Sequence, residues 1–247
     1  MYNKRLLCVL IISAILLSIF CTSCDTKKND HSSGNTENTN SSVTNEDKVP
    51  NNDSNTTNNN IGSRGLAFQP LSGGACMIIG IGSCIDTNID IPKYIDGYEV
   101  TGIGAKAFAN CSSFTNITLS DSIVTIGAEA FADCDQLTSI NIPDGIISIG
   151  AEAFTRCDSL KTVTILTGIT SLEHRTFAAC YNLRDITIPN TITRIAAEVF
   201  SGCVDLKRIH FQGTKAQWNG IAKDTNWDGN ADFYEVICED GTISYTH

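Results

Sequence analysis

The chain has 247 residues, of which 27 are acidic and 17 are Lys or Arg, giving a net charge of −10. Such an acidic surface repels phosphate groups, so the composition argues against nucleic acid and against electrostatic binding to anionic lipid. Hydrophobic residues make up 42% of the chain, enough for a folded core. The length beyond the N-terminal segments predicts one elongated domain.

The N-terminus predicts export. Two basic residues precede an apolar run from Leu6 to Phe20, and small residues follow it, so residues 1–23 are typical of a signal peptide. The run is shorter than the roughly 20 residues that cross a bilayer. Thr22 and Ser23 directly before Cys24 resemble a bacterial lipobox, which implies lipid attachment at Cys24 and a membrane anchor. Plain secretion and an uncleaved anchor are the alternatives.

Residues 24–60 are rich in Asn, Ser and Thr, with Val43 and Val49 as the only large apolar side chains. A segment of this composition cannot bury a core and is expected to be disordered. We interpret it as a tether between the anchor and the folded domain. An Asn-rich binding segment is the alternative.

A unit of 23 residues recurs five times between Ile103 and Gln212, for example IGAEAFADCDQLTSINIPDGIIS from Ile126. A fixed period of this length indicates a solenoid in which each unit forms one coil. In the same unit, alternation along LTSINI predicts a short strand with Ser139 and Asn141 pointing outward. The Ala-rich AEAF segment predicts one helical turn on the far side of the coil.

Two positions of the unit are occupied by the same residue type in every copy. One coil alone cannot bury a Phe, so neighbouring coils must cover it, and these positions are expected to form core columns. We interpret the Cys column as small buried hydrophobes with a weak donor, because adjacent coils hold β carbons about 4.8 Å apart, farther than a disulfide allows. Disulfides or a metal ladder along the column are the alternatives, and a disulfide between Cys76 and Cys84 in the N-terminal cap is also left open. The columns are Phe108, Phe131, Phe154, Phe177 and Phe200, and Cys111, Cys134, Cys157, Cys180 and Cys203.

These residues resemble the BspA-like leucine-rich-repeat family of bacterial surface proteins, whose unit is similar to IGxxAFxxCxxLxxIxIPxxVxx. The resemblance covers Ile89 to about Gln212. It implies a mainly β repeat solenoid, a right-handed coil with short parallel strands on a concave face and short helical or 3-10 turns opposite. Two departures, LEHRTF in unit four and Leu166 in place of Pro in unit three, affect local shape only.

The five repeats of residues 103–212 are expected to lie between two different caps, because the ends of a solenoid would otherwise expose apolar faces. Residues 61–102 form the N-terminal cap, with a hairpin turn at Asp96-Gly97. Residues 213–247 form the C-terminal cap, with a short helix over Gln217–Lys223 and a strand pair in FYEVICED and GTISYT. Its apolar area is expected from Trp218, Trp227 and Phe233.

One segment of the C-terminal cap fits the calcium-loop pattern D-x-[DN]-x-[DN]-G-x5-E at every required position. Oxygen ligands at these spacings suit a hard cation such as calcium. The alternative is a plain Asx-rich turn, since a strand and not an exit helix is predicted to follow. The candidate ligands are Asp224, Asn226, Asp228, Asp232 and Glu235.

Catalysis is not expected. The chain has only four His, and no Ser, His and acid set, Cys and His pair or glycine-rich phosphate loop stands out from the repeat. A uniform repeat distributes similar side chains along its length, whereas catalysis needs unlike groups at one point. We therefore predict no enzyme activity and no required cofactor.

The outward positions of the predicted strands form a candidate binding surface on the concave face. Five strands give it a length of about 24 Å. It is neutral and Thr-rich until charges appear in the last two strands, and a merely solvated face is the alternative. The candidate residues are Asn116, Thr118, Ser139, Asn141, Thr162, Thr164, Leu166, Asp185, Thr187, Arg208 and His210.

The resemblance implies adhesion, since members of this family attach to host proteins and to other bacteria. We therefore expect a lipid-anchored protein on the outer surface of the bacterial envelope that binds host matrix proteins or bacterial surface proteins. The alternative is a structural or assembly protein of the envelope with no external ligand. No residue of the chain identifies the partner.

Overall fold

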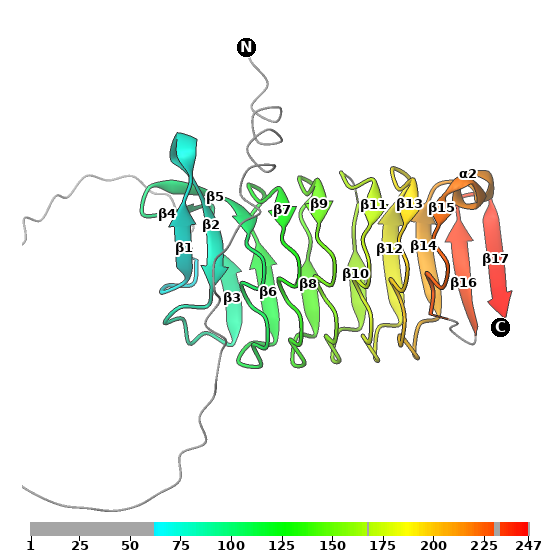
Figure 1. Cartoon of the computed structure of the whole chain (residues 1–247), viewed down its shortest axis with the longest axis horizontal. Coiled ribbons are helices and arrows are strands. Elements are labelled where there is room, and N and C mark those ends of the chain that lie inside the picture. Colours follow the sequence, from blue (N-terminus) through cyan, green and yellow to red (C-terminus); the bar gives the residue numbers. More distant parts are fainter. Residues whose placement is uncertain (1–61, 167, 230–232, 247) are drawn as a thin grey trace, which may run out of the picture.

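The computed structural model describes residues 62–166, 168–229 and 233–246. They form one row of stacked coils, so the predicted solenoid is confirmed (Figure 1). The predicted signal peptide, Cys24 and the tether lie outside the described residues. Among the described helices, none combines the length and the apolar character needed to cross a bilayer.

Each coil contributes one strand to an eight-stranded sheet with the order β17-β16-β14-β12-β10-β8-β6-β3. All neighbours from β3 to β16 are parallel, and β17 is antiparallel to β16. Residues 23 apart lie opposite each other, as Ser139 and Thr162 do. The strands are β3 (Asn88–Ile91), β6 (Asn116–Leu119), β8 (Ser139–Asn141), β10 (Thr162–Thr164), β12 (Asp185–Pro189), β14 (Arg208–Gln212), β16 (Phe233–Cys238) and β17 (Gly241–Thr246).

A second row, which we call the short strand row, has strands that end at the first residue of each repeat unit, and we did not predict the two-residue strands that it contains within the repeats. It forms two separate sheets, β1-β2-β5-β7-β9 with β4 on β5, and β11-β13-β15. The row is therefore interrupted between β9 and β11. The strands are β1 (Ala67–Pro70), β2 (Ala75–Gly80), β4 (Tyr94–Ile95), β5 (Tyr98–Ile103), β7 (Thr125–Ile126), β9 (Ser148–Ile149), β11 (Ser171–Leu172), β13 (Arg194–Ile195) and β15 (Ala222–Lys223).

The third side of each coil is a chain of β-turns and not the helical turn that we predicted. The N–H of Ala107 donates to the carbonyl of Gly104, and Lys106 between them has a φ of 58°, as a type II turn requires. The N–H of Phe108 donates sideways to the carbonyl of Ala130 in the next coil, at 2.8 Å. Hydrogen bonds between coils thus replace those along a helix axis, and this corrects the helical or 3-10 assignment.

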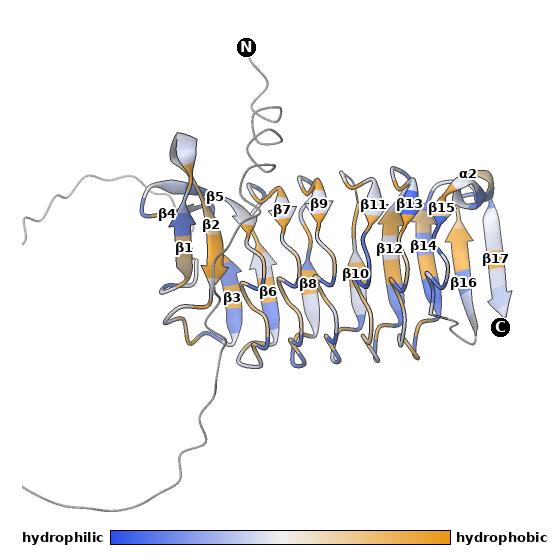
Figure 2. Cartoon of the chain, in the orientation of Figure 1, coloured by the Kyte–Doolittle hydropathy of each residue, from blue (hydrophilic) through white to orange (hydrophobic). Residues whose placement is uncertain are grey.

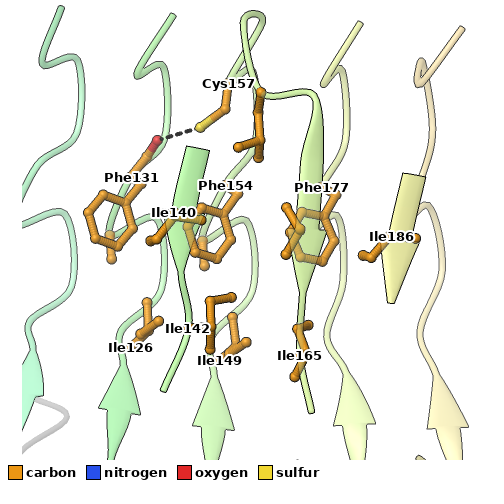
Figure 3. Packing of buried hydrophobic residues seen from close by; sticks show 14 of the residues in the cluster. Ile126, Phe131, Ile140, Ile142, Ile149, Phe154, Cys157, Ile165, Phe177 and Ile186 are labelled. Atoms are coloured by element: carbon orange, nitrogen blue, oxygen red, sulfur yellow. Dashed lines mark hydrogen bonds between the residues drawn. The ribbon is translucent and has the colours of Figure 1, made fainter. Parts of the chain in front are cut away.

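The Phe column is the centre of the core, as predicted. All five rings are fully buried, and successive rings stack nearly parallel with centroids 5.2 to 6.0 Å apart. Figure 3 shows three of them, Phe131, Phe154 and Phe177, in line between the strands. Apolar residues recur along the whole row of coils (Figure 2). Each coil therefore covers the ring of its neighbour.

The Cys column is buried and reduced, as expected. Four of its five thiols, those of Cys134, Cys157, Cys180 and Cys203, donate to the carbonyl of the Phe in the preceding coil. The distance is 3.1 Å from Cys157 to Phe131 (Figure 3) and 3.0 Å from Cys180 to Phe154. All eight described Cys are free. The bridge between Cys76 and Cys84 that we kept open is therefore not formed.

The N-terminal cap covers the first coil with two antiparallel pairs. β1 pairs with β2, and a short 3-10 turn, η1 (Ser72–Gly74), joins them. The predicted turn at Asp96 and Gly97 is confirmed, because both residues have positive φ and connect β4 to β5 with Ile95 opposite Tyr98. The first repeat is thereby covered with the different structure that a solenoid end needs.

The C-terminal cap contains the predicted strand pair and a short helix, α2 (Lys215–Gly220). The helix begins two residues earlier than predicted because Thr214 and Gln217 form a capping box. Trp218 and Trp227 are buried as expected, with rings 5.8 Å apart. The side chain of Phe233 lies outside the described residues. Tyr234, which we did not single out, is fully buried beside Trp227.

Candidate functional site

The outward positions of β6, β8, β10, β12 and β14 form one continuous surface, which we call the sheet face. Exposed and buried residues alternate along these strands, so Ser139 and Asn141 flank buried Ile140. The parallel register places the predicted residues in two rows. The first row is Asn116, Ser139, Thr162, Asp185 and Arg208, and the second is Thr118, Asn141, Thr164, Thr187 and His210.

Hydrogen bonds fix the first row at its N-terminal end. The amide nitrogen of Asn116 donates to the side-chain oxygen of Asn88 at 2.8 Å, and the hydroxyl of Ser139 donates to the side-chain oxygen of Asn116 at 2.7 Å. Asn88 belongs to β3 and extends the row by one strand beyond the predicted set. This end of the first row is therefore an ordered polar surface without charge, and Asp90 of β3 lies beside Thr118 at the same end of the second row.

Charge gathers at the C-terminal end of the same row. Arg208 donates from Nε and Nη2 to the two carboxylate oxygens of Asp185, with 3.1 Å between Nη2 and Oδ2. This bidentate pair lowers the pKa of Asp185, mainly through the hydrogen bond. His210 Nε2 lies 3.9 Å from Asp185 Oδ1, and Glu235 of β16 is opposite Arg208. Sequence spacing missed Glu235 as part of this face because the last register step is 27 residues.

A hollow of about 710 Å³ lies where β8 and β10 end. It brings together three predicted residues, Asn141, Thr164 and Leu166, and adds Asp121 and Asp144, which we did not predict. The side chain of Leu166 is 39% exposed, whereas Pro143 and Pro189 at the same position of other units are buried. The replacement of Pro by Leu was the only sign of this hollow in the sequence.

Two of the candidate calcium ligands are engaged elsewhere. The carboxylate of Asp224 accepts a hydrogen bond from Arg194 Nη2 at 2.6 Å. Asp228 is buried and accepts one from the hydroxyl of Tyr234 at 2.7 Å. Burial together with this partner raises the pKa of Tyr234. In the described structure, these two acids therefore support the cap.

The other candidate ligands do not complete a site in the described part of the chain. Asn226 has a φ of 59° in a turn, Glu235 lies within β16, and Asp232 is outside the described residues. Among the described residues, no group of three or more His, Cys, Asp or Glu is placed to hold a metal ion. Calcium binding stays a prediction, which calorimetric titration of the chain beside an Asp228→Ala variant would test.

The comparisons with known proteins agree with this architecture. The family model for the BspA type leucine rich repeat region matches residues 101–222 in six copies. A comparison with curated proteins gave no match. The matched range begins in β5 and ends in β15, so it reaches into both caps.

Solved structures of bacterial proteins share the fold. A leucine rich cell surface protein from Faecalibacterium prausnitzii A2-165 is 32% identical with a TM-score of 0.60, over 65% of this chain and 41% of that one. The leucine rich repeat protein TpLRR of T. pallidum is 26% identical with a TM-score of 0.56, over 59% and 68% of the two chains. This chain thus spans less than half of the F. prausnitzii protein. Residues 101–222 of the chain belong to the BspA-type leucine-rich-repeat family.

Proposed function

We propose that this chain is an exported bacterial envelope protein whose repeat domain binds a protein partner on the sheet face. The observation that carries the proposal is the contrast between the two sides of each strand. Inward positions hold the same residue types from coil to coil, whereas outward positions change from Asn and Ser to Thr and then to Asp and Arg. Packing explains the inward columns, and recognition of an extended partner would explain the outward variation.

The sheet face offers different contacts along its length. Thr and Asn side chains offer hydrogen bonds in the first coils, the hollow offers apolar contact at Leu166, and the pair of Asp185 and Arg208 offers charge. A partner that contacts all three regions must be extended along the row of coils. An adhesin for host matrix proteins or other bacteria would use the surface in this way, and the cell-surface relative from F. prausnitzii supports that setting.

Capture of host and bacterial surface proteins tests the face directly. The bait is the full chain in neutral detergent, and the variant removes Asp185 and Arg208 together, so that neither charge is left unpaired. We expect the double Ala variant to lose at least about tenfold in capture, because the partner would lose its contacts with both charged side chains and Arg is among the residues that contribute most to interfaces. The matched control replaces Lys106 and Glu129, which pair at 3.2 Å on the turn side of the coils. Equal capture by wild type and the Asp185 and Arg208 variant would contradict the proposal.

We further propose that Cys24 carries the lipid that anchors the chain. A Cys24→Ala variant is expected to leave the membrane fraction, because two or three acyl chains anchor a protein stably and the remaining chain lacks them. Protease treatment of intact cells separates an adhesin from the alternative, an inward-facing assembly protein. Cleavage of the repeat domain in intact cells favours the adhesin, and full protection favours the assembly role.

A further inference from the structure

Within the part of the chain that the structure describes, the eight-stranded sheet ends at β17, which pairs with β16 on one side. One hydrogen bond shows which backbone N–H and C=O groups of β17 point away from β16. The N–H of Glu235 in β16 donates to the carbonyl of Lys207, on the side of β14 and away from β17. Residues opposite each other in an antiparallel pair either exchange both bonds or neither. Ser244, the residue opposite Glu235, therefore turns its N–H and C=O outward.

Alternation along the strand gives Thr242 and Thr246 the same orientation as Ser244. The edge thus presents three N–H and three C=O groups in one line. The side chains between them, Ile243 and Tyr245, pack against the core instead. The outer edge of β17 therefore presents the row of backbone donors and acceptors with which a further strand can pair.

The opposite side of the molecule is protected against such pairing. The N–H and C=O of Asp90 in β3 are both bonded to Ser63, at 3.0 and 2.7 Å. The edge strand β1 contains Pro70 and a register shift after Ala67. Proline, bulges and covering segments are the usual means of blocking an edge. β17, with the sequence GTISYT, has no proline, no charge and no register shift.

The edge of β17 is also held rigidly. The hydroxyl of Tyr245 accepts a hydrogen bond from Trp218 Nε1 at 2.9 Å. Its ring stacks on Tyr234 with centroids 4.8 Å apart. Since both partners are core residues of the cap, β17 is ordered before anything binds to it. A preordered strand loses little conformational entropy on pairing.

We propose that two copies of this chain associate through β17, antiparallel and with the two Ser244 residues opposite each other. A two-fold axis at Ser244 places Thr242 of each copy opposite Thr246 of the other, so every outward N–H meets a C=O. The strand is uncharged and therefore compatible with itself. The Glu235 side chains of the two copies would be separated by three strand spacings, roughly 14 Å, and salt screens charges beyond about 8 Å. The two sheets would join into one.

Sedimentation velocity of the full chain in a density-matched neutral detergent tests this dimer. The variant is Ser244→Pro, which removes an N–H that makes no bond to β16, and the matched control is Ser244→Thr. We expect a monomer–dimer equilibrium in the wild type. The Pro variant should raise the dimer dissociation constant by about tenfold or more, because the symmetry removes two hydrogen bonds. The Thr control should dimerise like the wild type.

A second variant distinguishes the loss of the dimer interface from misfolding. Thr246→Pro removes another outward N–H at the end of the strand and should weaken the dimer in the same way, and near-ultraviolet circular dichroism checks the cap aromatics in both variants. A wild-type chain that stays monomeric into the millimolar range would overturn the proposal. So would a correctly folded Ser244→Pro chain that dimerises as the wild type does. A dimer strengthened by added salt would support it, because both copies are acidic.

Discussion

Left-handed backbone conformations recur at two positions of the repeat, and every residue there except Gly202 is a residue other than Gly. An L-residue in this conformation costs about 1 to 2 kcal/mol, so each coil carries strain in its turns. Charged residues at these positions pair between coils, as Asp133 and Arg156 do at 2.7 Å. Exposed pairs of this kind offset only a small part of the cost. The two sets are Lys106, Glu129, Glu152, Arg175 and Glu198, and Asn110, Asp133, Arg156, Ala179 and Gly202.

Ala179 provides a test of this strain, because its φ is 55° and the same position of the next coil is already Gly202. An Ala179→Gly substitution is expected to raise the free energy of unfolding by about 0.5 to 1 kcal/mol, since Gly adopts this conformation without steric cost. Urea denaturation would measure the change. Ala178, buried and without positive φ, is the control, and Ala178→Gly should destabilise by about 1.5 kcal/mol. A loss of stability in both variants would show that the backbone of Ala179 is not strained.

Because of the buried thiols of the Cys column, the stability of the folded chain depends on pH in the alkaline range. Burial raises the pKa of Cys157 and Cys180 well above the ordinary value of 9.0, and that of Cys203 to about 12. In the unfolded chain these thiols ionise near pH 9, whereas in the folded chain they stay protonated. Their contribution to stability is therefore complete below pH 9 and is lost as the pH rises from 9 towards 12.

We expect the free energy of unfolding to fall with pH above 9 by up to about 1.4 kcal/mol per pH unit for each thiol. Urea denaturation on either side of pH 9 would show this slope. The Cys203→Ala variant is less stable at every pH because it loses packing, but its slope above pH 9 should be smaller. An unchanged slope would mean that the thiols ionise freely in the folded protein.

The strands and core columns could be predicted from the sequence because they depend on side-chain type at a fixed period. Phe154 and Cys157 are buried, and the Phe and Cys at the same positions of the other units are buried for the same reason. The sequence of one unit is therefore enough to predict which of its side chains lie in the core. The turn side could not be predicted in the same way. Ala-rich AEAF favours a helix locally, but the N–H of Phe154 bonds to Thr176 in the next coil, and only stacking creates that acceptor.

The sheet face was predicted residue by residue, yet its organisation was not. The two rows follow from the period, but the hollow near Leu166 depends on Asp121 and Asp144, which belong to neighbouring coils. The acidic motif shows the opposite limit. It matched a ligand pattern, but Asp224 is bonded to Arg194, which lies outside the motif. Asp228 is bonded to Tyr234, which occupies a position that the pattern leaves unspecified.

Among the coils that the structure describes, neighbouring coils are joined by the same backbone hydrogen bonds except at one place. The N–H of Ile147 bonds to Val124 at 2.9 Å, and that of Thr193 bonds to Thr170 at 2.8 Å. Among the described residues, no equivalent bond joins Thr170 to Ile147, and this is where the short strand row breaks between β9 and β11. The turn side stays bonded across the break, for example from Phe154 to Thr176.

Hydrogen exchange would detect this break. The amide of Thr170 is expected to exchange at least about tenfold faster than those of Ile147 and Thr193, because its N–H lacks the bond that protects the other two. The comparison is internal, since all three residues occupy equivalent positions of successive units. Equal protection of the three amides would show that the row is continuous in solution.

The break between β9 and β11 also has a mechanical meaning. A load applied to the two ends of the row would pass through every junction between coils in series, and each junction would bear the same force. The weakest junction sets the strength of such an assembly, and here one of three sides is already open. Under tension, the molecule should therefore extend first in its middle, with each half still folded around its own cap.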